Sequence, residues 1–365
     1  MQIVQNIFMF IIPAVFALVI HNYLRHGELE ARKKLVDFAI YFVLINIVTF
    51  MFSFVRGVKE INFAEMTLTY RIKYIGLGCV LAFVLPFPVC LMTEDVITIG
   101  GMKRYALRFG RDIMKYFRYS VRAAKAELRS EVANSYLNWL WWLIEPFCMM
   151  LIYTVIFGYV FNASEENFPI FIFIGLIMWK FFSKGISGSV DIVRKNKSII
   201  KKVYMPKYIL LFTKMLVNGF KMIVSFGIVL LMMLVFKVPV SWKILYFVPI
   251  CLIFFLFTFG IGTIMMHYGV FVSDLGYIIE IVLRMLMYLT GIFYSISKRV
   301  PEPFGNLLEK FNPVACLIAS MRNVLLYDIC PEIGLLALWA FISMILIALG
   351  VFTVYSNENA YVRMI

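Results

Sequence analysis

Residues 244–272 read ILYFVPICLIFFLFTFGIGTIMMHYGVFV and contain no Asp, Glu, Lys or Arg. About 20 mostly apolar residues are enough for an α-helix to cross the hydrocarbon core of a bilayer. Eight further segments meet the same criterion: 3–24, 36–55, 73–92, 137–161, 169–192, 208–236, 277–296 and 334–355. The sequence therefore predicts an all-α, polytopic membrane protein.

The composition of the whole chain agrees with this prediction. Hydrophobic residues make up 62% of the 365 residues and charged residues 15%, whereas soluble domains are roughly 45–50% apolar. The charges lie mainly between the apolar segments, and no stretch is long and polar enough for an independent soluble domain. The first apolar segment has no basic region before it and no small-residue cleavage site, so we interpret it as a span and not as a signal peptide.

The formal net charge of +14 is distributed as in a membrane protein. Lys and Arg lie beside the predicted spans and form no basic domain, which argues against nucleic-acid binding. Most of them fall in segments 25–35, 93–136 and 193–207. Cytoplasmic loops carry the excess of basic residues in membrane proteins, so we expect the amino terminus outside and the carboxyl terminus inside.

The predicted spans divide the chain into three regions. Residues 1–100 hold three spans, residues 101–136 form a cytoplasmic segment, and residues 137–365 hold six spans. In the middle region basic residues recur every three or four positions among apolar ones, which predicts an amphipathic helix at the membrane surface; a simple basic linker is the alternative. These residues are Lys115, Arg118, Arg122, Lys125 and Arg129.

Segment 297–333 contains several prolines and two apolar pieces, 304–311 and 314–326, that are too short to cross a bilayer. We expect short helices or re-entrant pieces that enter the membrane from the outer side. Cys316 and Cys330 fall in this segment, and a disulfide between them is open from sequence alone.

Polar residues inside the predicted spans are the main functional signal. A charge at bilayer depth costs at least ~2.5–3.5 kcal/mol, so these side chains should face a cavity or a partner. Such a cavity would suit an anionic passenger, for example a lipid pyrophosphate; the alternative is that the lysines near span ends reach the headgroups. One helix face carries Lys180, Ser183, Lys184, Ser187, Gly188 and Asp191, a second carries Lys214, Asn218 and Lys221, and Arg284 lies in the eighth span.

The fourth span contains Glu145 followed by Pro146, a costly pair of residues at this depth. We expect Glu145 to pair with a cation such as Lys180 or Arg284. Trp141 and Trp142 begin the same span. They are either part of an interfacial aromatic belt or a surface on which sugar rings stack.

Signatures of catalysis and of metal binding are not found in the sequence. The phosphate loop GxxxxGK[ST], GxSxG and HExxH are missing, and the three histidines are too widely spread for a metal site. We therefore expect no catalytic residue, no metal and no cofactor bound by this chain. If ATP drives transport, the ATPase must be another chain.

Residues 125–365 resemble the permease subunits of type-2 ABC exporters of O-antigen, teichoic acid and capsular polysaccharide. The resemblance depends on the order and spacing of short stretches over about two thirds of the chain. These are LRS (128–130), NSYL (134–137), WWLIEP (141–146), FG (157–158), FPI (168–170), GLIMW (175–179), FFS (181–183), IIKKVYMP (199–206), SD (273–274), FNP (311–313) and RN (322–323).

The resemblance implies a six-helix permease core, a homodimer with a central pore, and two copies of an ATPase subunit that bind ATP and Mg²⁺. The passenger would be a polysaccharide on undecaprenyl pyrophosphate, moved across the bacterial cytoplasmic membrane. The three spans in residues 1–100 lie outside the family core, and their role stays open. Lys180 departs from the family pattern, in which a neutral polar residue is expected.

The resemblance also implies roles for individual residues. Segment 194–207 would contact the ATPase, and segment 297–333 would form an outer gate. Candidate channel residues are Trp141, Trp142, Glu145, Lys180, Lys184 and Arg284. Candidate coupling residues are Lys197, Lys201, Lys202, Tyr204 and Pro206, and candidate gate residues are Pro301, Pro303, Asn312, Pro313 and Arg322.

Two other functions are considered. One is a type-2 permease for a small lipid or drug, although the aromatic content and the polar helix faces favour a polymer. The other is a membrane glycosyltransferase or acyltransferase, which would need paired acids or a His–Asp set near an interface. Glu94-Asp95 is an adjacent acidic pair, but it has no nearby histidine.

Overall fold

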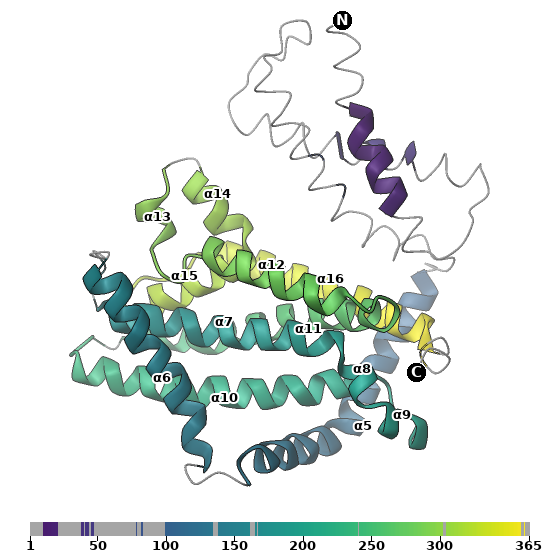
Figure 1. Ribbon diagram of the computed structural model, residues 1–365, viewed down its shortest axis with the longest axis horizontal. Coiled ribbons are helices and arrows are strands. Elements are labelled where there is room, and N and C mark those ends of the chain that lie inside the picture. Colours follow the sequence, from purple (N-terminus) through teal and green to yellow (C-terminus); the bar gives the residue numbers. More distant parts are fainter. Residues whose placement is uncertain are drawn as a thin grey trace, which may run out of the picture. The chain divides into compact units, whose positions relative to one another are not determined.

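The computed structural model describes residues 10–20, 38–39, 41–43, 45–46, 78, 82, 99–133, 138–160, 165, 167–239, 241–301, 304–358 and 361 (Figure 1). The chain divides into two compact units, Met1–Gly101 and Met102–Ile365. All regular structure among the described residues is helical, which confirms the predicted all-α fold.

Five stretches of the second unit are long and apolar enough to cross a membrane. The first is α6 (Trp141–Tyr153), preceded by the 3₁₀ turn η1 (Asn138–Leu140) and continued by the π-helical η2 (Thr154–Val160). The others are α7 (Phe168–Val190), α10 (Tyr208–Val235), the 3₁₀ turn η3 (Trp242–Tyr246) continued by α11 (Phe247–Phe271), and α16 (Ile333–Ser356). These helices lie within or close to five of the six predicted core spans.

The sixth predicted core span, 277–296, differs from the prediction. It is occupied by α12 (Leu275–Leu289), which has 15 residues and is too short to cross a bilayer as a straight helix. The chain turns at Gly291, whose φ is +67°. Ile292 and Phe293 continue the apolar composition but are buried in the turn, which is why composition alone predicted a longer helix.

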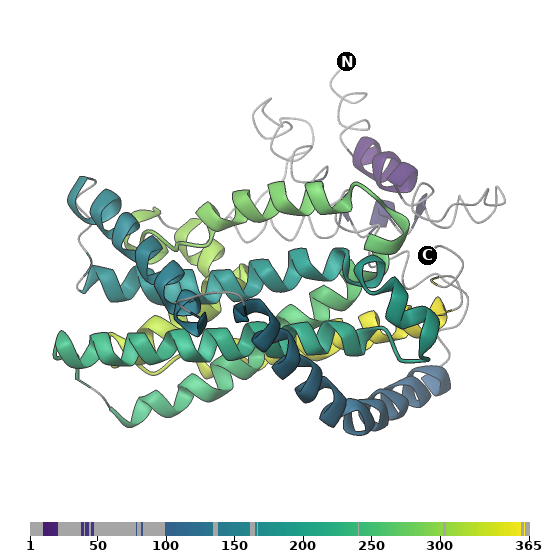
Figure 2. The same cartoon turned by 60° about the horizontal axis from the view of Figure 1, so that its bottom comes forward.

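Short helices occupy the two ends of the second unit (Figure 2). One end, called here the α9 end, carries α8 (Ile192–Lys195), α9 (Lys197–Lys202) and the last turns of α16. The opposite α14 end carries α13 (Ile296–Arg299), α14 (Phe304–Phe311) and α15 (Pro313–Leu325). α14 and α15 are the two short helices that the sequence predicts in segment 297–333.

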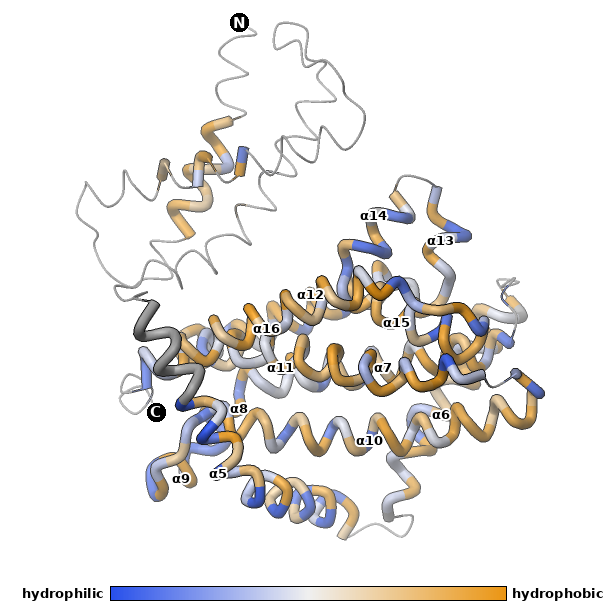
Figure 3. Tube along the Cα trace, turned by 180° about the vertical axis from the view of Figure 1, so that it is seen from behind, coloured by the Kyte–Doolittle hydropathy of each residue, from blue (hydrophilic) through white to orange (hydrophobic). Residues whose placement is uncertain are grey.

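The amphipathic segment forms α5 (Ile99–Val132), a helix longer than predicted. Hydrophilic and hydrophobic positions alternate along its coloured part, whereas α7, α10 and α11 are mainly hydrophobic (Figure 3). Phe109, Ile113 and Tyr116 pack against the core, and the predicted basic residues lie on the exposed side. An amphipathic helix is thus present over the predicted residues, and its location at a membrane surface stays a prediction.

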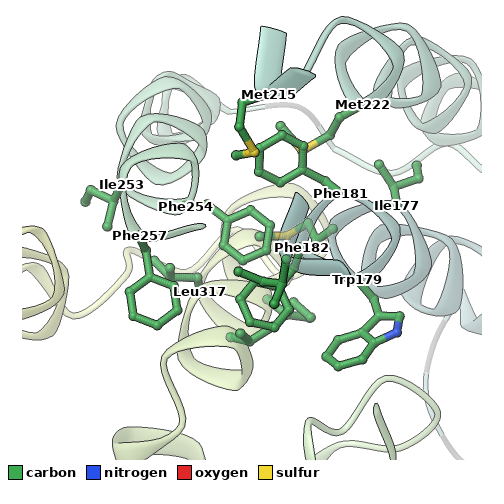
Figure 4. Packing of buried hydrophobic residues seen from close by; sticks show 14 of the residues in the cluster. Ile177, Trp179, Phe181, Phe182, Met215, Met222, Ile253, Phe254, Phe257 and Leu317 are labelled. Atoms are coloured by element: carbon green, nitrogen blue, oxygen red, sulfur yellow. The ribbon is translucent and has the colours of Figure 1, made fainter. Parts of the chain in front are cut away.

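The core of the second unit is built around α7. In its apolar window 72% of the residues are buried, against 11% for α6, so α7 is central and α6 peripheral. Phe181 and Phe182 of α7 face Phe254 and Phe257 of α11, with ring centroids 5.6–6.3 Å apart (Figure 4). Offset and tilted aromatic pairs at this spacing add to the stabilisation from burial.

α11 and α16 pack closely because each helix presents a glycine to the other. A Cβ atom at Gly260 would lie 2.9 Å from Cβ of Leu346, and one at Gly350 would overlap the side chain of Thr263. Small residues at helix contacts let backbones approach closely, as is common in membrane proteins.

The first unit contains the helix Phe10–Ile20, which falls in the predicted span 3–24. Asn46 donates hydrogen bonds to the carbonyls of Phe42 at 2.6 Å and Phe10 at 3.4 Å. Most of the three predicted spans of this region lies outside the described residues, and so does Pro303. In the second unit, Cys316 and Cys330 are free thiols, so no disulfide joins them.

Candidate transport cavity

A cavity of about 430 Å³ opens between α6, α7 and α10, with further side chains from α5 and α12. Both polar helix faces identified in the sequence line it, with the exception of Ser183. From α7 and α8 come Ile177, Lys180, Phe181, Lys184, Ser187, Gly188, Asp191 and Lys195, and from α10 Lys214, Asn218, Lys221, Met222 and Ser225. The remaining lining residues are Glu131, Trp142, Glu145, Pro146, Gly276 and Glu280.

The lysines of the cavity are largely neutralised by carboxylates. Lys180 Nζ lies 2.8 Å from Glu145 Oε2, which is one of the two pairings that the sequence left open. Lys195 Nζ lies 3.6 Å from Asp191 Oδ2. The cavity therefore carries charges of both signs, whereas the polar faces alone suggested a mainly basic cavity.

Two carboxylates from α5 complete this neutralisation. Lys214 donates to Glu127, and Lys221 donates to Glu131. Neither lysine needs to reach lipid headgroups. Among the described side chains, Lys184 is the cavity lysine for which no ion pair is found, and it is exposed to the cavity.

Four of the six predicted channel residues meet at this cavity: Trp142, Glu145, Lys180 and Lys184. The ring of Trp142 lies beneath Lys221 Nζ, 5.6 Å from the ring centroid, a cation–π distance. The other two, Trp141 and Arg284, are exposed side chains that do not line it.

Sequence reasoning missed the acids that α5 and α12 supply. Glu127, Glu131 and Glu280 are far in sequence from the lysines beside the cavity. One signal was available, because Glu127 and Glu131 are spaced i, i+4 in a mainly basic helix. That spacing places both on one face, toward a cationic neighbour.

The predicted coupling residues lie at the α9 end. Lys197, Lys201 and Lys202 of α9 are exposed, while Pro206 is buried. The hydroxyl of Tyr204 accepts a hydrogen bond from Arg108 at 2.8 Å and donates one to Glu358 at 3.0 Å. Partial burial and the hydrogen bond to Glu358 raise the pKa of the Tyr204 phenol, so it stays protonated and keeps donating at neutral pH.

At the α14 end, Arg322 is buried and contacts backbone instead of lying at a surface. It donates from Nε to Phe171 O at 3.1 Å, from Nη1 to Gly291 O at 2.8 Å and from Nη2 to Ile292 O at 2.8 Å. Its guanidinium also lies 3.5 Å from the centroid of the Phe171 ring. This arginine therefore ties α15 to the start of α7 and to the turn after α12.

The other predicted gate residues have local roles in the structure. The side chain of Asn312 accepts from the backbone N–H groups of Val314 at 3.1 Å and Ala315 at 3.3 Å. With Pro313 in the first turn, this is the N-cap of α15. Pro301 is exposed before α14.

A second cavity of about 260 Å³ lies between Arg322 and the helices of the α14 end. Glu309 of α14 and Tyr327 are among the residues that line it. Burial, with a smaller contribution from the nearby Glu332 carboxylate, raises the pKa of Glu309. The ionised form of this carboxyl is thus disfavoured in the folded protein.

Comparison with known proteins places these features in a family. The model of the ABC-2 type transporter family matches residues 122–326, which include the cavity and most of the α14 end. The chain is 24% identical over 241 residues to the O-antigen export system permease protein RfbA of Myxococcus xanthus, covering 66% of this chain and 93% of that protein.

Two further relatives show the same relationship. An O-antigen export system permease protein RfbA of Klebsiella pneumoniae is 26% identical over 199 residues, or 54% of this chain and 76% of that protein. The polysialic acid transport protein KpsM of Escherichia coli is 22% identical over 239 residues, or 64% of this chain and 91% of that protein. With five membrane-capable helices and a family model that matches more than half of its length, the chain is a multi-pass membrane protein and belongs to the ABC-2 type transporter family.

Proposed function

We propose that this chain is the membrane-spanning subunit of an ATP-driven exporter of polysaccharide linked to undecaprenyl pyrophosphate. The observation that carries the proposal is the charged cavity among apolar helices, because charges at this depth need a watery route or a partner. The names of the relatives, which refer to O-antigen export and polysialic acid transport, support a glycan passenger.

Within this proposal, Lys184 contacts the anionic headgroup of the passenger. Lys180, Lys195, Lys214 and Lys221 are held by carboxylates, so they have less free charge to offer. Lys184 lies on the same face of α7 as Ser187 and Gly188, where hydroxyl and backbone groups are close to the cavity. A pyrophosphate is recognised by cationic and hydrogen-bonding donors of this kind.

The proposal includes a homodimer with the passenger route between two copies. α6 and α12 expose wide apolar faces, and the exposed face of α12 also carries Glu280 and Arg284. Charged side chains on a lipid-facing surface are costly, which favours a second copy or a water-filled route beside α12. Trp141, on the exposed side of α6, would lie near the same boundary.

We further propose that the ATPase is a separate subunit, present in two copies, that contacts the α9 end. Lys197, Lys201 and Lys202 are exposed there on a helix with no buried residue. The sequence has no phosphate loop of its own. The α9 end would then face the cytoplasm and the α14 end the outer side of the bacterial cytoplasmic membrane, with the amino terminus outside.

The passenger site is tested by binding of undecaprenyl pyrophosphate to the chain in lipid nanodiscs, with the uncharged alcohol undecaprenol as reference. Lys184→Ala should weaken pyrophosphate binding about tenfold, the loss of roughly one charge-assisted contact, and leave undecaprenol binding unchanged. Lys310→Ala, at the opposite end and paired with Glu332, is the matched control. Equal binding by wild type and K184A would refute the assigned contact.

The ATPase partner is tested by purification of the chain in mild detergent, followed by identification of bound proteins. We expect a subunit with a phosphate loop, and its retention should fall when Lys201 and Lys202 are both replaced by Glu. Isolation of the chain without such a subunit, together with the absence of ATP-dependent glycan transport in membrane vesicles, would contradict the proposed export function.

A further inference from the structure

A cluster of charged and phenolic side chains joins three separate elements at the α9 end. At its centre is Glu358, just beyond α16, which accepts hydrogen bonds from Tyr204 at 3.0 Å and from Lys207 at 3.1 Å. Nη2 of Arg108, on α5, lies 3.8 Å from Oε2 of the same carboxylate. One carboxylate thus receives cations or donors from α5 and from the segment that follows α9.

Burial makes the contact between Lys207 and Glu358 different from a surface ion pair. Lys207 is 3% exposed, and the side chain of Glu358 is 16% exposed. A lysine this buried is stable as a cation only while an opposite charge is next to it. The position of Lys207, and of the chain around it, is therefore tied to Glu358.

A second layer of hydrogen bonds lies directly beneath. Asp112 of α5 accepts from Tyr355 at 2.7 Å and from Tyr208 at 3.1 Å, and the two phenol oxygens are 2.6 Å apart. The guanidinium of Arg108 lies 4.4 Å from the centroid of the Tyr355 ring. The first turn of α10 and the last turn of α16 are thereby joined to α5 as well.

α9 itself has no fully buried residue, and its contact with the core is through the partly buried side chain of Ile200, so packing of its own side chains holds it to the bundle only weakly. Its attachment on the carboxyl side depends on the chain from Tyr204 to Tyr208, where the polar cluster begins. α16, in turn, is packed against α11 through Gly260 and Gly350. A displacement of α9 is consequently passed through these contacts to two long helices of the bundle, α10 and α16.

We propose that Glu358 is a positioning residue that fastens the segment 203–207 to α5 and to the end of α16, so that these elements move as one body. In the proposed exporter, this connection transmits displacement of α9 by the ATPase to α10, α16 and the amphipathic helix. The first statement, that these elements move as one body, is the mechanical part of the proposal and depends only on the contacts above. The second statement, that displacement of α9 is transmitted to the other helices, is the transmission part and rests on the proposed function.

The mechanical part is tested by hydrogen exchange on the full chain in nanodiscs, without ATPase or passenger. Glu358→Gln keeps the shape of the side chain but removes its charge. We expect backbone amides in 199–207 and in the 108–113 part of α5 to exchange at least fivefold faster in this variant. The matched control is Glu332→Gln, which removes the carboxylate of the exposed pair with Lys310 at the other end, and it should leave both segments unchanged.

Unchanged exchange in both segments of E358Q, or a change confined to residues after 356, would overturn the proposal. If E358Q does not accumulate as folded protein, the same exchange measurement is made on Tyr204→Phe. This substitution removes only a hydroxyl from a largely exposed ring. The same two segments should then exchange faster, by a smaller factor, and no change would be a negative result for the proposal.

The transmission part is tested with the chain and its ATPase in proteoliposomes, as glycan moved per ATP hydrolysed. E358Q should lower this ratio at least threefold while ATP hydrolysis continues, and E332Q should not change it. An unchanged ratio together with faster exchange would overturn transmission through Glu358. Failure of the wild-type complex to move glycan would instead count against the proposed function, and the exchange result would stand independently.

Discussion

A Cβ atom at Gly175 would lie 2.6 Å from Nη2 of Arg322, so the guanidinium reaches its place beside α7 because residue 175 is glycine. From there Nη2 donates to Ile292 O at 2.8 Å, in the turn that ends α12. The glycine and the arginine are on different helices, and together they determine where the chain turns between α12 and α13.

Gly175→Ala should destabilise the protein by about 1–3 kcal/mol, the usual cost of adding a methyl group to a packed site. Gly188→Ala is the control on the same helix, since a Cβ atom there meets nothing within 4 Å. Alanine is the better helix former, so this control should be neutral or stabilising by up to about 1 kcal/mol. Thermal unfolding in detergent measures both, and equal effects of the two substitutions would contradict the close contact.

Arg322→Met should be at least as harmful as Gly175→Ala, because three backbone carbonyls lose a hydrogen bond from the guanidinium at once. The carbonyl of Phe171 lies inside α7 and keeps its intrahelical donor, whereas those of Gly291 and Ile292 lie outside the helices and are left unpaired. Each buried acceptor left unpaired costs about 1–3 kcal/mol, so we expect a loss of at least about 2 kcal/mol. Arg322→Lys should fall between the two, since an ammonium has the charge but not the planar fork of donors. The exposed Arg299→Met is the control. Wild-type melting of R322M would show that the carbonyls find other partners.

The behaviour of Arg322 shows what the sequence could not predict. It lies in the proline-rich segment 297–333, which the family resemblance implied to be an outer gate. Nothing local indicates that its partners are Phe171 and Gly291, which are 151 and 31 residues away. The end of α12 was mispredicted for the same reason, because a turn fixed by a distant side chain is invisible to hydropathy.

The charged cavity could be predicted from the sequence better than the contacts of Arg322. Lys180, Lys184 and Ser187 follow helical spacing in an apolar span, and the cost of isolated charge in a bilayer requires that face to be sheltered. The pairing of Glu145 with Lys180 was one of the two pairings that the sequence left open, the other being with Arg284. The carboxylates of α5 were not anticipated, since Glu127 lies 87 residues from Lys214.

The contact between α11 and α16 provides a test of glycine packing. Gly350→Ala should destabilise the protein by about 1–3 kcal/mol, because a methyl group there overlaps the side chain of Thr263. Gly334→Ala, in the first turn of the same helix, meets nothing within 4 Å and should have little effect. Melting temperature and the yield of monodisperse protein measure the difference. Similar behaviour of the two variants would argue against close packing at this contact.

The raised pKa of Glu309 predicts a pH dependence at the α14 end. A carboxyl whose pKa is higher in the folded than in the unfolded protein favours folding below its unfolded pKa, and this contribution is lost as pH rises through the folded value. Glu309→Gln should therefore stabilise the protein at pH 7.5 and have a smaller effect near pH 4.5. Melting temperatures of both proteins at the two pH values test this, and a pH-independent difference would contradict it. Arg299→Gln, at an exposed position of α13, is the control.

The pair between Lys180 and Glu145 predicts a specific rescue. Glu145→Lys alone would place two ammonium groups together at the 2.8 Å contact, and Lys180→Glu alone would place two carboxylates there, so each should destabilise the protein. The double variant restores opposite charges across α6 and α7 and should recover most of the loss. The side chain of Glu145 is 63% exposed and that of Lys180 is 37% exposed. We therefore expect a coupling energy of only about 1 kcal/mol when the melting of the wild type, the two single variants and the double variant is compared. Additive losses in the double variant would mean that the pair does not hold α6 against α7, and that these two charges face the cavity independently.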